Sequence, residues 1–104
     1  MNGNEVRLCG LAHDVAALRF TPAGVPVLEF RLRHESLQDE AGGKRRVELD
    51  LPAIAFGNLA QRLAQDAPGA AITARGFLAP RSLRSTQLVL HAREIEFDRG
   101  ASWQ

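Results

Sequence analysis

The stretch GNLAQRLAQDAPG (Gly57–Gly69) decides the fold, because the apolar spacing changes there from the period of a strand to that of a helix. Leu59 and Leu63 lie four residues apart, as they do on one face of a helix. Asn58 is a candidate N-cap, and Pro68-Gly69 is a stop signal. The stretch therefore predicts one short helix of about two to three turns.

The segments on both sides of this helix alternate between apolar and polar residues, and turn signals separate them. In the clearest one, Leu28, Phe30 and Leu32 point to one face. In the segment before the helix, Val47 and Leu49 are expected to face the core in the same way. The predicted strands are Glu5–Ala12, Pro26–His34, Lys44–Ile54, Ala70–Pro80 and Gln87–Phe97.

Two details of these strands carry further expectations. Gly10, inside the first strand, predicts a bulge or a sharp bend. Pro52 is expected at an edge or a bend, because proline cannot donate to a ladder.

The order of these elements is that of an all-β OB-fold, a five-stranded barrel with one short helix between strands 3 and 4. At 104 residues the chain has the length of a single domain. We expect the OB-fold domain to cover residues 1–98. A flexible C-terminal tail, residues 99–104, would then contain the only tryptophan, Trp103.

The amino-acid composition alone excludes few classes of protein. Thirteen basic and twelve acidic residues give a net charge of +1, which is too balanced to predict nucleic-acid binding. Twelve of the thirteen basic residues are arginine, which is suited to phosphate contacts, although a GC-rich genome would also favour arginine codons.

The predicted cellular location is the cytoplasm. The N-terminus has no apolar h-region, so we expect no signal peptide, and the longest apolar run, Leu51–Phe56, is too short to span a bilayer. The single cysteine, Cys9, cannot form an internal disulfide, which fits a reducing compartment. Because it lies among apolar strand residues, Cys9 is expected to be a buried, inert thiol.

Several segments resemble the primosomal replication protein N (PriB) family of bacteria. They are RLCG (residues 7–10), TPAGVPVLEFRLRHESLQDEAG (21–42), LPAIAFGN (51–58), ITARGFLA (72–79) and LVLHAREIEF (88–97). The resemblance extends from about Arg7 to Phe97, and the TPAG to EAG segment is its most specific part. It implies a cytoplasmic homodimer of OB-folds without a catalytic centre or cofactor. The implied role is the reloading of the replicative helicase at stalled forks, and the implied partners are single-stranded DNA, the helicase PriA and, in some bacteria, the loader DnaT.

The candidate DNA-binding residues are basic and lie in loops or at strand ends that an OB-fold would bring to one face. The resemblance puts a basic DNA-contacting residue at Arg19. Taken singly, each of these side chains is more often solvated surface than a ligand contact. The full set is Arg19, Arg33, His34, Lys44, Arg45, Arg46, Arg81 and Arg84.

The aromatic side chains that usually stack bases are missing from the region around Lys44. By the resemblance, Glu48 stands where better-known relatives have a tryptophan, Gly43 where an aromatic occurs and Glu35 where an arginine occurs. We therefore expect weak single-strand binding that depends strongly on salt. If two to four phosphates are neutralised, the slope of log K against log salt would be about −1.4 to −2.8.

The five phenylalanines are expected to be core or dimer contacts, and Phe77 is the first to test as a base platform. They are Phe20, Phe30, Phe56, Phe77 and Phe97. If DNA quenched the fluorescence of Trp103, the tail would have to fold back onto the groove.

No enzymatic or metal motif is present in the sequence. His13, His34 and His91 lack metal-ligand spacing, and a single cysteine does not complete a zinc site. Ser36, His34 and Asp39 are close only in sequence, which does not make a catalytic triad. There is no phosphate-binding GxxxxGK loop, and Gly42-Gly43 is interpreted as loop flexibility.

Two alternatives remain open. Glu35, Gly43 and Glu48 fit a protein-interaction OB module that has largely lost DNA binding. An RNA-binding OB domain is disfavoured, because cold-shock-type modules have aromatic-rich strand motifs that this chain lacks.

Overall fold

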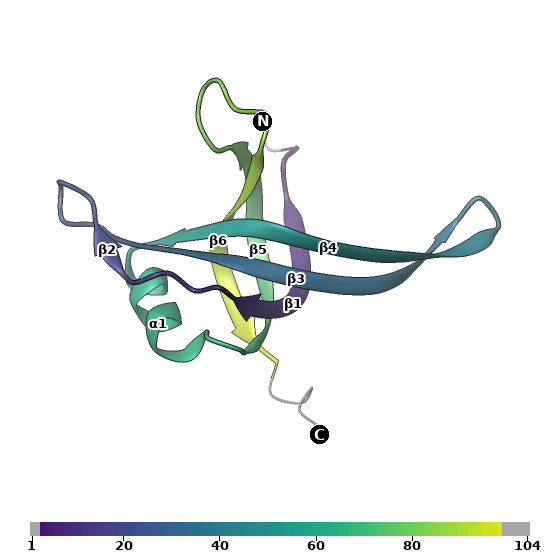
Figure 1. Ribbon diagram of the computed structural model, residues 1–104, viewed down its shortest axis with the longest axis horizontal. Coiled ribbons are helices and arrows are strands. Elements are labelled where there is room, and N and C mark those ends of the chain that lie inside the picture. Colours follow the sequence, from purple (N-terminus) through teal and green to yellow (C-terminus); the bar gives the residue numbers. More distant parts are fainter. Residues whose placement is uncertain (1–2, 99–104) are drawn as a thin grey trace.

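The computed structural model describes residues 3–98, which form six strands and one helix. Figure 1 shows a long ribbon of two strands crossing a steeper group of three, with the helix against one end of the barrel. The elements are β1 (Val6–His13), β2 (Arg19–Phe20), β3 (Pro26–Glu40), β4 (Gly43–Phe56), α1 (Asn58–Asp66), β5 (Ala71–Pro80) and β6 (Leu88–Phe97).

Five of the six strands close into the barrel expected for an OB-fold. The sheet order is β1-β5-β6-β4-β3-β2, and a further pairing between β1 and β3 closes it. The sixth strand, β2, has two residues and pairs only with β3. The predicted fold class and the place of the helix are therefore confirmed.

Gly10 lies next to the point where β1 changes partners. Val6–Leu11 pair with β5, and Leu11–His13 pair with β3, so Leu11 pairs with both strands. A Cβ atom at position 10 would collide with the backbone carbonyl of Arg33. The glycine is thus required by close approach of two strands, and the register shift of the sheet lies at Arg75/Gly76 instead.

The core is formed by the alternation seen in the sequence. Leu28 and Leu32 are fully buried and Phe30 is 3% exposed. The helix covers one end of the barrel with Ala60 and Leu63, both fully buried. The predicted N-cap is wrong by one residue: Gly57 occupies that position with a positive φ of 73°, and no side chain caps the helix.

The largest difference from the expected fold lies between Glu35 and Glu48, here called the hairpin arm. The predicted strands ended at His34 and began again at Lys44, with a loop between them, but β3 and β4 stay paired up to Glu40 and Gly43. Ala41 and Gly42 both have positive φ, as a two-residue type I′ hairpin turn requires. The arm extends past the barrel in Figure 1, and the molecule is 50 Å long.

Three burial expectations are corrected by this geometry. Val47 is half-buried and Leu49 is 38% exposed, because each lies where β4 has left the barrel. Cys9 is exposed, since it shares the outward face of β1 with Arg7. Pro52 is not at the expected edge or bend: it is buried within β4, pairs with Arg31 of β3 and lies one residue before the short β4–β6 ladder.

Within residues 3–98, no helix has the length and apolar character needed to cross a membrane.

Candidate nucleic-acid interface

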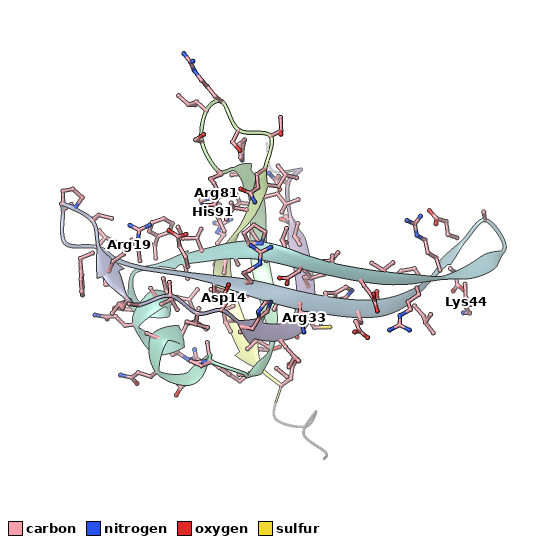
Figure 2. The ribbon with its side chains drawn as sticks, in the orientation of Figure 1. Asp14, Arg19, Arg33, Lys44, Arg81 and His91 are labelled. Atoms are coloured by element: carbon pink, nitrogen blue, oxygen red, sulfur yellow. The ribbon has the colours of Figure 1, made fainter. Side chains whose placement is uncertain are left out.

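A groove of about 460 Å³ lies over β3, β4 and β6, between the loop that follows β1 and the loop that joins β5 to β6. An OB-fold binds oligonucleotides on this face. Figure 2 shows Asp14, Arg19, Arg81 and His91 gathered around it. Its lining is Asp14, Ala16, Arg19, Glu29, Phe30, Arg31, Pro52, Ala53, Ile54, Phe56, Arg81, Val89 and His91.

Two predicted arginines, Arg19 of the short strand β2 and Arg81 of the loop after β5, converge in this groove. An Nη atom of Arg19 lies 2.6 Å from an Oε atom of Glu29, and an Nη atom of Arg81 lies 3.9 Å from the other. Arg81 also donates from Nε to Gln87 Oε1 at 2.7 Å. Two guanidinium groups therefore share the Glu29 carboxylate, and Asp14 is the second acidic residue in the lining of the groove.

Arg33 and Arg84 lie outside the groove. Arg33 is exposed on β3 and lines a smaller hollow beside Glu35 and Glu48. Arg84 is exposed in the loop between β5 and β6. Neither forms an ion pair with another of the described residues, so both guanidinium groups are available to phosphate.

The basic run on the hairpin arm is paired with acids of the same arm. Lys44 Nζ lies 2.6 Å from Asp39 Oδ1, and Arg45 Nη1 lies 3.0 Å from Glu40 Oε1. Figure 2 shows Lys44 at the tip, far from the groove.

The third cation of the run is held by two acids. Arg46 Nη2 lies 2.6 Å from Glu48 and 3.5 Å from Glu35. Counted over residues 35–48, three basic side chains meet four carboxylates, which leaves the arm with a net charge of −1.

His34 is placed differently from the other predicted residues. It is 8% exposed, and both ring nitrogens have hydrogen-bond partners: Nδ1 lies 2.7 Å from the carbonyl of Cys9 and Nε2 lies 2.9 Å from Ser36 Oγ. Because Nδ1 faces a carbonyl, it is the nitrogen that donates. The ring joins β1 to β3, and we leave His34 out of the proposed interface.

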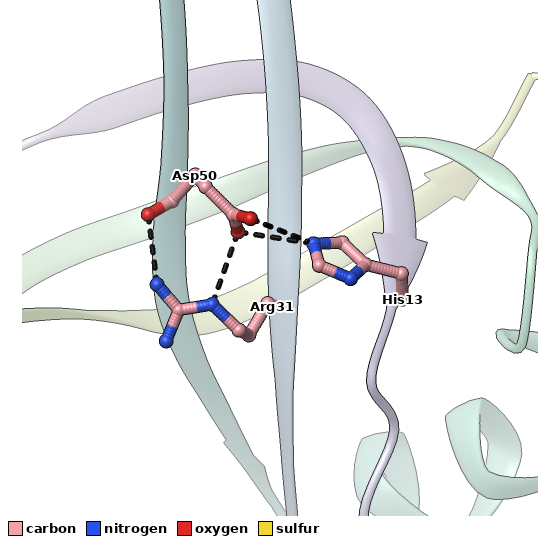
Figure 3. Close-up of polar contacts among 3 residues, drawn as sticks. All are labelled: His13, Arg31 and Asp50. Atoms are coloured by element: carbon pink, nitrogen blue, oxygen red, sulfur yellow. Dashed lines mark hydrogen bonds and ion pairs between the residues drawn. The ribbon is translucent and has the colours of Figure 1, made fainter.

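A cluster of His13, Arg31 and Asp50 fixes three strands beside the groove (Figure 3). His13 Nε2 lies 3.0 and 3.1 Å from the two Asp50 oxygens, and Arg31 donates from Nε to Asp50 Oδ1 at 3.1 Å. Burial acts to raise the pKa of Asp50, but hydrogen bonds and charge from His13 and Arg31 outweigh it and lower that pKa. The cluster joins β1, β3 and β4 where the barrel closes.

The aromatic residues beside the groove were not recognised as a group from the sequence. The ring of His91 stacks on Phe77, with centroids 4.9 Å apart, and on Phe56, with centroids 6.1 Å apart. Phe30 lies in the core as expected, but Phe56 is 45% exposed and Phe20 is 58% exposed, so neither is a core residue. In the stretch LPAIAF the buried residues are Pro52, Ala53 and Ala55, and Phe56 alternates with Ala55 onto the exposed face.

Metal ligands do not assemble on this surface: residues 3–98 contain no group of three or more His, Cys, Asp or Glu side chains placed to hold an ion.

Comparison with known proteins identifies the family. The model described as "Another single-strand binding protein family" matches residues 4–94. A replication restart protein PriB from Nitrosomonas europaea is 40% identical over 94 residues, which are 90% of this chain and 87% of that protein. PriB from Bordetella pertussis is 43% identical over 91 residues, with 88% and 85% covered. The chain belongs to the PriB family of single-strand binding proteins.

Solved structures agree with this assignment. PriB from Ralstonia solanacearum superposes with a TM-score of 0.80 at 32% identity, over 90% of this chain and 96% of that one. A small single-stranded DNA-binding protein from Streptomyces coelicolor gives a TM-score of 0.76 over the whole of both chains, and at 20% identity it supports the fold alone.

Proposed function

We propose that this chain is a non-enzymatic accessory protein of replication restart that binds single-stranded DNA weakly and binds the helicase PriA. The family membership supports this role, since the PriB relatives match over most of their length. The structural observation that supports it best is the convergence on one groove of Arg19, from the segment between β1 and β3, and Arg81, from the loop between β5 and β6. In an OB-fold, connections of this kind bracket the nucleic-acid face.

In this proposal the groove provides the main DNA contact. Arg19 and Arg81 bind phosphates there, and Arg33 and Arg84 add contacts from the neighbouring surface. The paired cations of the arm, Lys44, Arg45 and Arg46, reach phosphate only by exchanging their carboxylate partners. Exposed ion pairs are worth about 0–1 kcal/mol, so this exchange is possible but adds little affinity.

The proposed mechanism is bridging. Contact with the helicase holds the protein at the fork, and weak contact with the displaced strand then occurs at a raised effective concentration, about millimolar for a short tether. Where the organism has a DnaT loader, DnaT then binds the complex of this protein, PriA and the DNA strand. The site of action is the cytoplasm.

We also propose that the chain acts as a homodimer. Val6–Gly10 of β1 pair with β5 on one side and have no strand on the other among the described residues. An open strand edge is a template for pairing with another chain. Sedimentation equilibrium should give twice the mass of one chain, and a single-chain mass at micromolar concentration would exclude the dimer.

A salt series of binding to a dT oligonucleotide, with and without PriA, tests the DNA part of the proposal. We expect a slope of log K against log salt of about −1.4 to −2.8 for two to four neutralised phosphates. Nanomolar binding that is insensitive to salt would contradict it. If DNA and helicase share the groove, saturating DNA should reduce the affinity for PriA; an undiminished affinity would show separate sites.

The second candidate function is a protein-interaction module that has largely lost DNA binding, and the internal ion pairs of the arm favour it. A triple alanine variant at Lys44, Arg45 and Arg46 separates the two. If DNA binding is unchanged while PriA binding fails, the arm is a helicase contact and the second function holds. If DNA binding falls and its salt slope becomes shallower, the arm contacts DNA.

A further inference from the structure

A second hollow, of about 640 Å³, lies over β1, β5 and β6 and shares no lining residue with the groove. We call it the arginine hollow, because each of these three strands contributes an arginine to it. Its lining is Glu5, Val6, Arg7, Arg75, Gly76, Arg93 and Glu94. The arginine hollow is therefore built on the sheet, whereas the groove lies between loops.

The sheet register sets three charged side chains of the arginine hollow in a row. Arg7 is directly opposite Arg75 across β1–β5, and Arg75 is directly opposite Glu94 across β5–β6. All three residues are exposed. Side chains directly opposite in an antiparallel pair have Cβ atoms about 5 Å apart, so two like charges meet where Arg7 faces Arg75.

A β-bulge adds the third arginine. The register of β5 and β6 shifts between Arg75 and Gly76, which leaves Arg93 as an extra residue of β6. A bulge of this kind re-aims a side chain. Here Arg93 and Glu94 are both exposed, although strict alternation along a strand would bury one of them. A Cβ atom at position 76 would collide with the backbone carbonyl of His91, so the glycine permits the bulge.

Two walls of the arginine hollow are held in place by neighbouring residues. The guanidinium carbon of Arg93 lies 5.9 Å from the centroid of the Phe77 ring, within the range of a cation–π contact. Asn4 donates from Nδ2 to the carbonyl of Leu78 at 2.7 Å, and its Oδ1 accepts from the N–H of Leu78 at 3.0 Å. These two bonds fasten the segment that carries Glu5 to β5. A ligand therefore meets preformed walls, which reduces the entropic cost of binding.

The arginines of this hollow lack close carboxylate partners among the described residues. Arg75 Nη1 lies 4.0 Å from Glu94 Oε1, at the limit of an ion pair. Within residues 3–98, Arg7 and Arg93 form no ion pair. The hairpin arm differs, because each of its three cations lies within 3.0 Å of a carboxylate oxygen. Opposed guanidinium groups repel each other, and an anion bound between them would remove that repulsion.

The residues of the arginine hollow favour carboxylates over a DNA strand as this anion. A guanidinium group binds a carboxylate through two parallel N–H bonds. DNA carries a phosphate at every nucleotide, so a strand laid across the hollow would also bring phosphate near Glu5 or Glu94. The lining has no aromatic ring on which a base could stack. A short peptide, in contrast, can place two or three carboxylates on the arginines and avoid the glutamates.

We propose that the arginine hollow is a second binding site, which takes a short acidic peptide segment of a partner protein. Carboxylates of the segment bind Arg7, Arg75 and Arg93. Because the hollow and the groove have no residue in common, the peptide and a DNA strand bind at the same time. The site goes beyond the proposed DNA binding and does not depend on it.

NMR spectra of the ¹⁵N-labelled full-length protein, titrated with two peptides, test this proposal. The probe is a short peptide of glycine and serine with three consecutive aspartates, and the matched peptide has asparagines in their place. The acidic peptide should shift the backbone amide signals of Arg7, Arg75 and Arg93 and leave those of Arg19 and Arg81 unchanged. The asparagine peptide should shift neither set.

Variants of exposed arginines measure the contribution of the cations. The double variant Arg7→Gln, Arg75→Gln should weaken binding of the acidic peptide about 2- to 25-fold, at about 1.4- to 5-fold for each exposed pair. Arg62→Gln, which removes an exposed arginine from helix α1, is the matched control and should bind as the wild-type protein does. Arg7→Gln alone should raise the melting temperature, because it ends the repulsion from Arg75.

The proposal is overturned if the acidic peptide shifts no signal or shifts those of Arg19 and Arg81 instead, or if the asparagine peptide acts equally. It is also overturned if the double variant binds the acidic peptide as tightly as the wild-type protein. A lower melting temperature for Arg7→Gln would show that the opposed arginines serve the fold, with the same consequence.

A dT oligonucleotide distinguishes the peptide from DNA as the occupant. The double variant Arg7→Gln, Arg75→Gln should bind dT with the affinity and the salt slope of the wild-type protein. A shallower slope of log K against log salt would make the arginine hollow part of the DNA interface and would overturn the proposal.

Discussion

The strongest prediction concerns the two glutamates that hold Arg46. Glu35 and Glu48 are directly opposite each other in the β3–β4 ladder, and the Arg46 guanidinium lies within 3.5 Å of both. Replacing both with glutamine preserves side-chain shape and hydrogen bonding but removes two carboxylates. The net charge of the hairpin arm then changes from −1 to +1, and Arg46 is freed.

The expected effect on DNA binding follows from counterion release. One additional neutralised phosphate makes the slope of log K against log salt steeper by about 0.7. If the new contact contributes nothing at 1 M salt, the same slope gives about a fivefold gain in affinity at 0.1 M. Stability should change little, because the side chains are 56–67% exposed and the lost ion pairs are offset by removal of like charges facing each other.

Fluorescence anisotropy of a labelled dT oligonucleotide across a salt series measures both quantities. The matched control is Asp66→Asn, which removes one carboxylate from the end of helix α1, and it is compared with the single variant Glu48→Gln. The reasoning is refuted if the double variant has the slope of the wild-type protein. It is also refuted if Asp66→Asn strengthens binding as much as Glu48→Gln, because the effect would then come from net charge.

Three further predictions concern the groove and the barrel. Arg81→Ala should make the slope of log K against log salt shallower by about 0.7, whereas Arg62→Ala, on the helix, should leave it unchanged. Equal slopes for the two variants would show that Arg81 does not contact DNA. Asp50→Asn should lower the free energy of unfolding at neutral pH by about 1 kcal/mol. The pKa of Asp50 is lowered on folding, so the Asp50 carboxylate stabilises the folded state above the ordinary pKa of 3.8. This stabilisation is lost as the pH falls through the folded-state pKa. Urea unfolding measured against pH should show the loss in the wild-type protein and not in the variant. Gly10→Ala should destabilise the barrel by about 1–3 kcal/mol in thermal unfolding. The control Gly43→Ala should not, because a Cβ atom at position 43 meets nothing within 4 Å. Equal melting temperatures for the two variants would contradict the close approach of β1 and β3.

The alternating strands and the single helix could be predicted because they follow local rules. Leu28, Phe30 and Leu32 alternate with polar residues, and burial follows that alternation. The stop at Pro68-Gly69 agrees with a helix that ends at Asp66. Element order then selected the OB-fold, since few topologies place one helix among five strands in this way.

The extent of each strand could not be predicted. Val47 and Leu49 continue the alternation of a core strand, yet β4 has left the barrel at that point and has nothing to pack against. The same limit explains Cys9, whose burial depends on which face of β1 meets the core. Local pattern gives the period of a strand but not where its partners end.

For the interface, the sequence by itself determined which residue types are available: arginines in the loops and no aromatic residue at Gly43 or Glu48. Only the tertiary structure decided their partners. It brought Arg19 and Arg81 to one groove, placed Arg46 between Glu48 of its own strand and Glu35 across the hairpin, and stacked Phe56 on His91 from a different strand. The physical reason is that electrostatic and stacking energies depend on distances through space, and barrel closure sets those distances between residues far apart in the chain.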